Sequence, residues 1–294
     1  MTDKSHPIQT YFLPQPSHWP IIGSFSLFFS LVGLINIIHE NWYGYCLFLL
    51  GAILLTYMLY GWFGTVIAES RNGLHSPQMD RTYRWGMFWF IASEVAFFGA
   101  FFGALHYSRQ YAVPSLGGLI DPIETHTLLW PKFKALWPLL VNPNPTQFVG
   151  PKETIPPFGI PALNTLLLLS SAATVTWAHW GLKKNRRFQL ILGVILTIVL
   201  GLSFLFFQAF EYTEAYRHLH LTLHSGIYGT TFFMLTGFHG AHVTIGLTML
   251  SVILYRCIKG DFLPEHHFGF EAVSWYWHFV DVVWLFLFVL VYWL

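Results

Sequence analysis

Seven long apolar stretches set the strongest limit on how this chain can fold. A helix needs about 20 mostly apolar residues to cross the hydrocarbon core of a bilayer, and each stretch is long enough. No window alternates between polar and apolar residues as the strands of a membrane β-barrel do. Only 10% of the 294 residues are charged, against roughly 25% in soluble domains, so lipid is the expected solvent. The sequence predicts an all-α polytopic membrane protein with seven transmembrane helices, over 21–38, 43–67, 84–105, 162–181, 188–210, 227–256 and 272–294.

The connections between these spans predict the orientation of the chain. Lys and Arg are enriched in the cytoplasmic loops of membrane proteins. With the N-terminal segment 1–20, which contains Lys4, in the cytoplasm, that side carries ten such residues and the opposite side five. Four of those five lie in one long connection, where the rule is weak. We therefore predict a cytoplasmic N-terminus and a periplasmic C-terminus.

The long connection covers 106–161 and contains 10 of the 16 prolines. Proline disrupts helix interiors, so most of this segment is expected to be irregular. Long irregular loops are usually functional or disordered. Trp130, Phe133, Trp137 and Phe148 give this one apolar surface to bury, so we predict a periplasmic cap on a single domain that covers 1–294.

Two glutamates are expected at or near membrane depth. Glu94 lies in the middle of the 84–105 span, where an ionised carboxylate would lose its hydration, so it should be protonated or hydrogen-bonded. It is predicted either to join two helices or to act in a proton relay or a lipid site. Glu211 follows the 188–210 span and is expected near the outer interface, where water or lipid amines can reach it.

Two further pairs of polar residues have helical spacing. His239 and His242 are three residues apart and share a helix face. A membrane metal centre needs more ligands, and only His278, Asp281 and Glu211 are further candidates near membrane depth. Hydrogen bonding between helices is therefore favoured over metal binding. His278 and Asp281 are also three residues apart and are expected to hydrogen-bond to each other.

Interfacial residues gather near the ends of several spans. Trp275, Tyr276 and Trp277 lie three to five residues into the last predicted span, which suits an aromatic belt at the headgroups. Basic residues and histidines on the cytoplasmic side would attract anionic headgroups, although ordinary positive-inside charge explains them equally well. This group contains Arg71, His75, Arg84, Arg256, Lys259, His266 and His267, together with Glu69.

The sequence has no signature of an independent catalyst. Cys46 and Cys257 stand alone, without the spacing of a disulfide framework, a zinc ribbon or a c-type haem attachment. There is no Walker loop, no Ser-His-Asp grouping and no thiolate pair for a binuclear copper centre. The formal net charge of +1 argues against a nucleic-acid partner. We predict no catalytic residue and no metal ligand in this chain.

Four segments resemble the subunit III family of cytochrome c oxidases. They read VIAES at 66–70, FIASEV at 90–95, YGTTFF and TGFHGAHV at 228–243, and HHFGFE and WYWHFVDVVW at 266–284. The similarity covers almost the whole chain apart from 121–157. It implies a subunit without redox metal that packs beside subunits I and II, where subunit I holds the haems and copper, and that contacts cytochrome c only indirectly. It also implies a two-helix plus five-helix arrangement with a V-shaped cleft for phospholipids, and a role in stabilising subunit I and supporting proton uptake during reduction of O2.

The resemblance also suggests site residues. Glu94 aligns with a buried glutamate of the family's third helix. The family often has arginine where this chain has Ala68, and Arg71 lies about one turn further on. The long connection is similar to that of gammaproteobacterial members, so a bacterial inner membrane is favoured. The predicted lipid-binding residues are Trp62, Glu69, Arg71, His75, Arg256 and Lys259, and the predicted proton-linked residues are Glu94, Glu211, His239, His242, His278 and Asp281.

Two other functions fit the sequence less well. Subunit III of a quinol oxidase or of a nitric-oxide reductase complex usually lacks the first two spans, which are present here. A proton-coupled transporter would favour broken helices and internal repeats, and the sequence shows neither.

Overall fold

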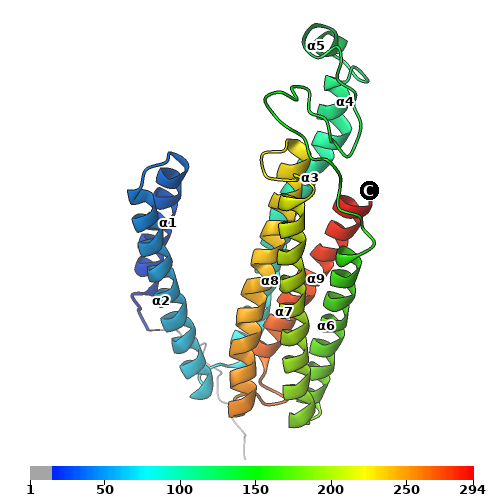
Figure 1. Cartoon of the computed structure of the whole chain (residues 1–294). Coiled ribbons are helices and arrows are strands. Elements are labelled where there is room, and N and C mark those ends of the chain that lie inside the picture. The colour runs from blue at the N-terminus through cyan, green and yellow to red at the C-terminus, as the bar shows by residue number, and fades with distance from the viewer. Residues whose placement is uncertain (1–14) are drawn as a thin grey trace, which may run out of the picture. The chain divides into compact units, whose positions relative to one another are not determined.

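A computed structural model describes residues 15–294 (Figure 1). This part of the chain contains helices and no strands, and seven helical spans are long and apolar enough to cross a membrane, which confirms the predicted fold class. Most of the predicted N-terminal segment 1–20, including Lys4, lies outside the described residues. The spans are formed by α1 (Trp19–Ile38), α2 (Tyr43–Arg71), α3 (Pro77–Tyr107), α6 (Ile160–Lys183), α7 (Arg187–Arg217), α8 (Ile227–Lys259) and α9 (Phe268–Leu287).

Most helices extend beyond the apolar windows that predicted them. α3 and α7 have 31 residues each, which at about 1.5 Å per residue corresponds to roughly 46 Å. A bilayer with its headgroup regions is about 40–45 Å thick. Polar residues at the ends of these helices therefore continue the helix into the headgroup region, where hydropathy gives no signal.

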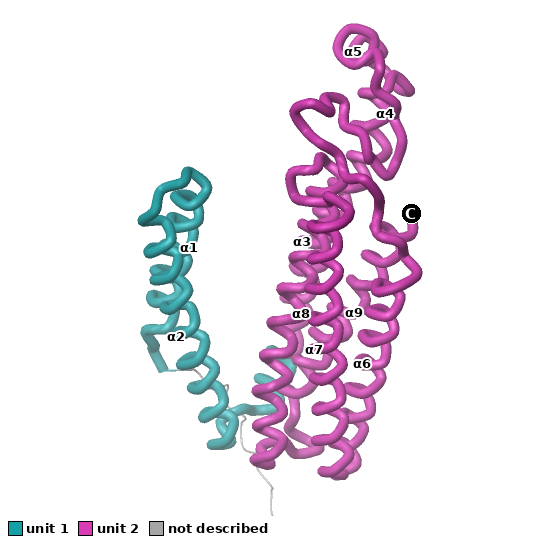
Figure 2. Tube along the Cα trace, in the orientation of Figure 1, with its two compact units in different colours: residues 1–83 teal, residues 84–294 magenta. Residues whose placement is uncertain are grey.

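The chain divides into two compact units, coloured separately in Figure 2. The first, over residues 15–83, contains the hairpin of α1 and α2. Small residues let the two backbones approach: a Cβ at Gly44 would lie 2.6 Å from the backbone nitrogen of Ile37. Ser26 donates its hydroxyl to the carbonyl of Gly51 at 3.0 Å. Lipid tails are as apolar as leucine, so close packing of this kind is what holds two membrane helices together.

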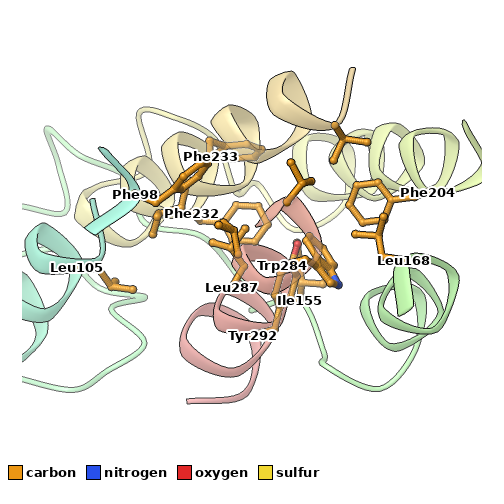
Figure 3. Packing of buried hydrophobic residues seen from close by; sticks show 14 of the residues in the cluster. Phe98, Leu105, Ile155, Leu168, Phe204, Phe232, Phe233, Trp284, Leu287 and Tyr292 are labelled. Carbon is orange, nitrogen blue, oxygen red and sulfur yellow. The ribbon is translucent and has the colours of Figure 1, made fainter. Parts of the chain in front are cut away.

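The second unit, Arg84–Leu294, contains most of α3 and all of α6 to α9. A large cluster of buried side chains joins these helices, and a second, smaller cluster joins α6, α7, α8 and α9. Figure 3 shows part of the large cluster, with Phe98 of α3, Phe204 of α7, Phe232 of α8 and Trp284 of α9. After α9 the chain continues as a π-helix, η2 (Phe288–Trp293).

Trp277 of α9 is the contact point of three other helices. A Cβ on Gly201 of α7 would lie 2.8 Å from its ring, and a Cβ on Gly246 of α8 would lie 2.9 Å from it. The indole Nε1–H donates to the hydroxyl of Ser171 on α6 at 2.8 Å. Tyr276 and Trp277 are both buried. The prediction that they form a headgroup belt is wrong, because α9 begins four residues before the predicted span and both side chains face the bundle.

The long connection begins later than predicted. α3 continues through a π-helix, η1 (Ser108–Ala112), into α4 (Val113–Leu116), so the predicted boundary at 106 is wrong. Pro114 lies in the first turn of α4, where a missing N–H costs little. A short helix, α5 (Ile123–Leu129), follows, and the chain then runs without a long helix to α6.

The remainder of the connection packs on the second unit. Phe133 is buried, and Trp130 and Trp137 are half-buried against the same core. Phe148 is exposed, in contrast to the prediction. The side-chain amide of Asn142 donates to the carbonyl of Ser225, between α7 and α8, at 3.1 Å. The cap is therefore anchored by both apolar and polar contacts.

Candidate functional site

Glu94 of α3 and His242 of α8 form a polar pair inside the helical bundle. The Oε2 atom of Glu94 lies 2.9 Å from Nε2 of His242. The two side chains are 22% and 13% exposed, so both are partly withdrawn from the surface. This arrangement confirms that Glu94 joins two helices through a hydrogen bond.

The other ring nitrogen of His242 limits the ways in which this pair can share a proton. Nδ1 lies 2.7 Å from the backbone carbonyl of Phe238. Because a carbonyl oxygen can only accept, Nδ1 must carry a hydrogen. Nε2 then either accepts a hydrogen from a protonated Glu94 or, as imidazolium, donates one to the carboxylate. The pair is electrically neutral in both forms, and the proton between its atoms can transfer without changing the net charge.

Aromatic side chains surround this pair. The ring of His242 lies 5.0 Å from that of Phe98 and 5.9 Å from that of Phe97. Tyr276 of α9 stacks on His242, and its hydroxyl donates to the backbone carbonyl of His242 at 3.3 Å. These rings limit the access of water, which strengthens the electrostatic interaction between the paired side chains.

His239 does not make the hydrogen bonds that were predicted for it. It is 1% exposed, and neither ring nitrogen has a hydrogen-bond partner among residues 15–294. Its ring lies between those of Phe204 and Trp284, at 5.6 Å and 5.2 Å. His239 and His242 were predicted to share a helix face, but their side chains have different neighbours. The reason is that other helices surround α8 at His239.

His278 and Asp281 do not form the predicted hydrogen bond. Nδ1 of His278 lies 4.0 Å from the nearer carboxylate oxygen of Asp281, which is beyond hydrogen-bonding distance. His278 contacts the hydroxyl of Thr176 on α6 at 3.3 Å instead. Asp281 is buried, and neither of its carboxylate oxygens has a partner in the described part of the chain.

Glu211 is inside the bundle, so the prediction of an interfacial position is wrong. It is 2% exposed. Its Oε1 accepts hydrogen bonds from the hydroxyl of Tyr292 at 2.6 Å and from the amide of Gln208 at 3.1 Å. Asn164 of α6 donates to Gln208 at 3.4 Å. The reason for the error is that α7 continues to Arg217, almost two turns beyond Glu211.

Three of the predicted lipid-binding residues of the first unit lie at the end of α2 or just after it. His75 and Glu69 approach to 3.8 Å, between Nε2 and Oε2. Arg71 is the last residue of α2. Trp62, further up the same helix, is exposed, as an interfacial tryptophan would be.

The predicted lipid-binding residues of the second unit lie at the end of α8. Arg256 forms an ion pair with Asp261 at 3.2 Å, and its guanidinium lies 4.4 Å from the centre of the Phe262 ring. Lys259 lies over the ring of Tyr255 at 5.6 Å. Arg256 and Lys259 are the basic residues of the last turn of α8. Cations at this end of a helix interact favourably with the helix dipole.

Sequence reasoning missed several of these partners. Asp261 returns to Arg256 because Gly260 ends α8 in the left-handed conformation, and a glycine after a basic last turn is a recognisable helix stop. Arg84 also forms an ion pair with Glu271 of α9. No comparable sequence signal links Tyr292 to Glu211, which are 81 residues apart.

The described residues contain no group of three or more His, Cys, Asp or Glu that could hold a metal ion. Cys46 and Cys257 lie on α2 and α8, as expected of small apolar residues in or beside a span, and neither forms a disulfide in this part of the chain.

Comparison with known proteins agrees with this arrangement. The family model described as cytochrome c oxidase subunit III matches residues 9–142 and 144–294. The chain belongs to the cytochrome c oxidase subunit III family. Cytochrome c oxidase subunit 3 of Cyprinus carpio is 42% identical over 290 residues, 98% of each chain. That of Scyliorhinus canicula is 42% identical over 294 residues, 100% of this chain and 99% of the relative.

Membership of the subunit III family has direct consequences. The chain is a multi-pass membrane component of an oxidoreductase complex in the respiratory chain, and it assembles with other oxidase subunits. The family match includes nearly all of 121–157, which the motif-based resemblance left out.

Proposed function

We propose that this chain is a non-redox subunit that stabilises subunit I of a proton-pumping cytochrome c oxidase and supports proton uptake during reduction of O2 to water. It lies beside subunits I and II, and cytochrome c reaches it only through the complex. The observation that carries this proposal is the 2.9 Å contact between Oε2 of Glu94 and Nε2 of His242, across which we infer that a proton is shared. This contact is an ionisable link between two helices of the bundle, α3 and α8.

A proton-sharing pair suits this role better than an isolated carboxylate. Burying a lone charge is costly, whereas a pair that is neutral in both of its forms avoids most of that cost. The described residues do not enclose Glu94 completely, since 22% of its side chain is exposed, and we infer that its carboxyl group exchanges protons on that side. Of the other predicted proton-linked residues, Glu211, His239 and Asp281 are buried and His278 is only partly exposed. We assign these four a structural role in the bundle.

Phospholipid is the second ligand that we propose. Arg256 and Lys259 place two cations in the last turn of α8, and each basic residue near the surface attracts an anionic headgroup by about 1 kcal/mol. Trp62, Glu69, Arg71 and His75 are the corresponding candidates of the first unit. The V-shaped cleft implied by the family resemblance stays a prediction.

The location of the complex is also part of the proposal. We infer a bacterial inner membrane, with the N-terminus in the cytoplasm and the C-terminus in the periplasm, from the positive-inside distribution and the long connection. We treat residues 1–294 as one functional domain. The two spans before α3 and the names of the two relatives favour a cytochrome c oxidase over a quinol oxidase or a nitric-oxide reductase.

The test is Glu94→Gln in the purified oxidase. Glutamine keeps the shape and one hydrogen bond but cannot transfer a proton. We expect unchanged haem content, slower proton uptake and a shorter lifetime during turnover. Ser93→Ala, a change of an exposed neighbour on α3, is the matched control and should behave as wild type. Loss of haem from the Glu94 variant, or wild-type proton uptake and lifetime, would contradict the proposal.

A further inference from the structure

The connection between α5 and α6 forms a half-open cavity that the proposed function does not use. It has a volume of about 580 Å³ and is lined only by residues from 129–145. This volume falls within the roughly 300–1,000 Å³ of ligand pockets in proteins. The cavity belongs entirely to the second unit and shares no residue with the lipid-binding candidates discussed above.

The chemistry of the lining is uneven. Most of the wall is apolar, with Leu129, Leu136 and Leu139 among the contributors. Two lysines, Lys132 and Lys134, also line the cavity, and no acidic residue does. Neither lysine has an ion-pair partner in the part of the chain that the structure describes. An apolar wall beside two unneutralised cations complements a ligand with an apolar tail and an anionic head.

The local backbone explains this division. Phe133 is buried in the main core of the bundle, whereas Lys132 and Lys134 on either side of it are exposed. The backbone N–H of Phe133 donates to the carbonyl of Trp130 at 3.0 Å, which closes a turn. With Phe133 anchored in the core, both lysines remain on the exposed side of this turn. Four prolines in the lining restrict the backbone, and Asn142 ties the cavity to Ser225 at 3.1 Å. The site is therefore formed before a ligand arrives.

The position of the cavity identifies the source of such a ligand. The connection lies between two membrane spans, after the extension of α3 to Leu116 and before α6, which begins at Ile160, so both of its ends are joined to helices that cross the bilayer. Leu128, Leu136 and Val141 are all more than 60% exposed, a costly composition for a surface that faces only water. We propose that the 129–145 cavity binds one acyl chain of an anionic phospholipid, whose headgroup is held by Lys132 and Lys134.

The experiment uses the whole oxidase complex in phosphatidylcholine vesicles. One sample contains a trace of phosphatidylglycerol with a photoreactive diazirine on its acyl chain, and the other contains phosphatidylcholine with the same label. After illumination, mass spectrometry maps the labelled residues. We expect labelling within 129–145 that is several-fold stronger for the phosphatidylglycerol probe. Equal labelling by both probes, or none in this segment, would overturn the proposal.

Variants test the role of the charges. Lys132→Gln with Lys134→Gln should weaken labelling by the anionic probe about 30-fold, from the usual effect of two basic residues at a lipid surface. Lys152→Gln is the matched control, because Lys152 is an exposed lysine of the same connection outside the cavity. If the anionic probe labels both variants equally within 129–145, the lysines do not hold the headgroup and the proposal is wrong. The same is true if a lysine-specific cross-linker joins Lys134 to another oxidase subunit while the lipid probe is excluded, since the cavity is then a protein interface.

Discussion

The hydroxyl of Tyr292 donates to Oε1 of Glu211 at 2.6 Å, which ties the C-terminal turn to the middle of the bundle. Tyr292 lies in the π-helix η2, and Glu211 lies on α7. The carboxyl group also receives the amide of Gln208. Because an unpaired polar group in a membrane interior is costly, this contact stabilises both α7 and the last turn of the chain.

Removing the Tyr292 hydroxyl should therefore destabilise the protein. Tyr292→Phe keeps the ring packing but leaves Glu211 with one donor fewer, and we expect a loss of about 1–2 kcal/mol. Equilibrium unfolding of the full chain in mixed micelles measures it. Tyr216→Phe is the matched control, because Tyr216 is an exposed tyrosine of α7, the helix that carries Glu211. Equal stability of both variants would mean that the Tyr292 contact contributes nothing.

Glu211 itself should tolerate an amide but not an alkyl side chain. Glutamine keeps the acceptor for Tyr292, so Glu211→Gln should change the free energy of unfolding by less than about 1 kcal/mol. Glu211→Leu leaves the donors of Tyr292 and Gln208 without their acceptor and should cost about 2–4 kcal/mol. A loss for glutamine as large as that for leucine would show that the negative charge is needed and that an acceptor alone is not enough.

The contact of Trp277 with Gly246 predicts a steric effect. A Cβ at Gly246 would lie 2.9 Å from the Trp277 ring, so Gly246→Ala should cost about 1–3 kcal/mol through overpacking. Gly240→Ala on the same helix is the control, since no atom lies within 4 Å of its added Cβ. Thermal unfolding of the purified complex compares the two. If the Gly246 variant is as stable as the Gly240 variant, α8 and α9 are less tightly packed than the structure indicates.

These contacts show what the sequence could and could not predict. Spans are predictable because hydropathy reports contact with lipid, residue by residue. Pairing between helices is not, because it depends on the rotation of each helix. His239 and His242 share spacing but have different neighbours, and Glu211 was assigned to the interface only because the apolar window ended before the helix did. Glu94 was the exception, since a carboxyl group in the middle of a span must find a partner.

The ion pair of Arg256 with Asp261 predicts opposite effects of two substitutions on lipid retention. Arg256→Gln removes a cation and should reduce the number of phospholipids that remain bound in native mass spectrometry. Asp261→Asn removes the carboxylate that competes for Arg256 and should maintain or increase that number. Lys259→Gln is the comparison, because it shows how many bound phospholipids are lost when the other cation of the same turn is removed. Unchanged lipid counts in the Arg256 variant would remove this residue from the lipid site.

The pair of Glu94 and His242 should act as a unit. If the two side chains interact only with each other, changing both costs little more than changing one, because the second substitution removes a partner that is already lost. For Glu94→Gln, His242→Gln and the double variant, we expect a coupling energy of about 1 kcal/mol in unfolding experiments, the size of interhelical hydrogen bonds in membranes. Turnover lifetime of the oxidase should be non-additive in the same way. Additive effects in both measurements would mean that the 2.9 Å contact links the helices without coupling their function, and proton sharing between the two residues would have to be abandoned.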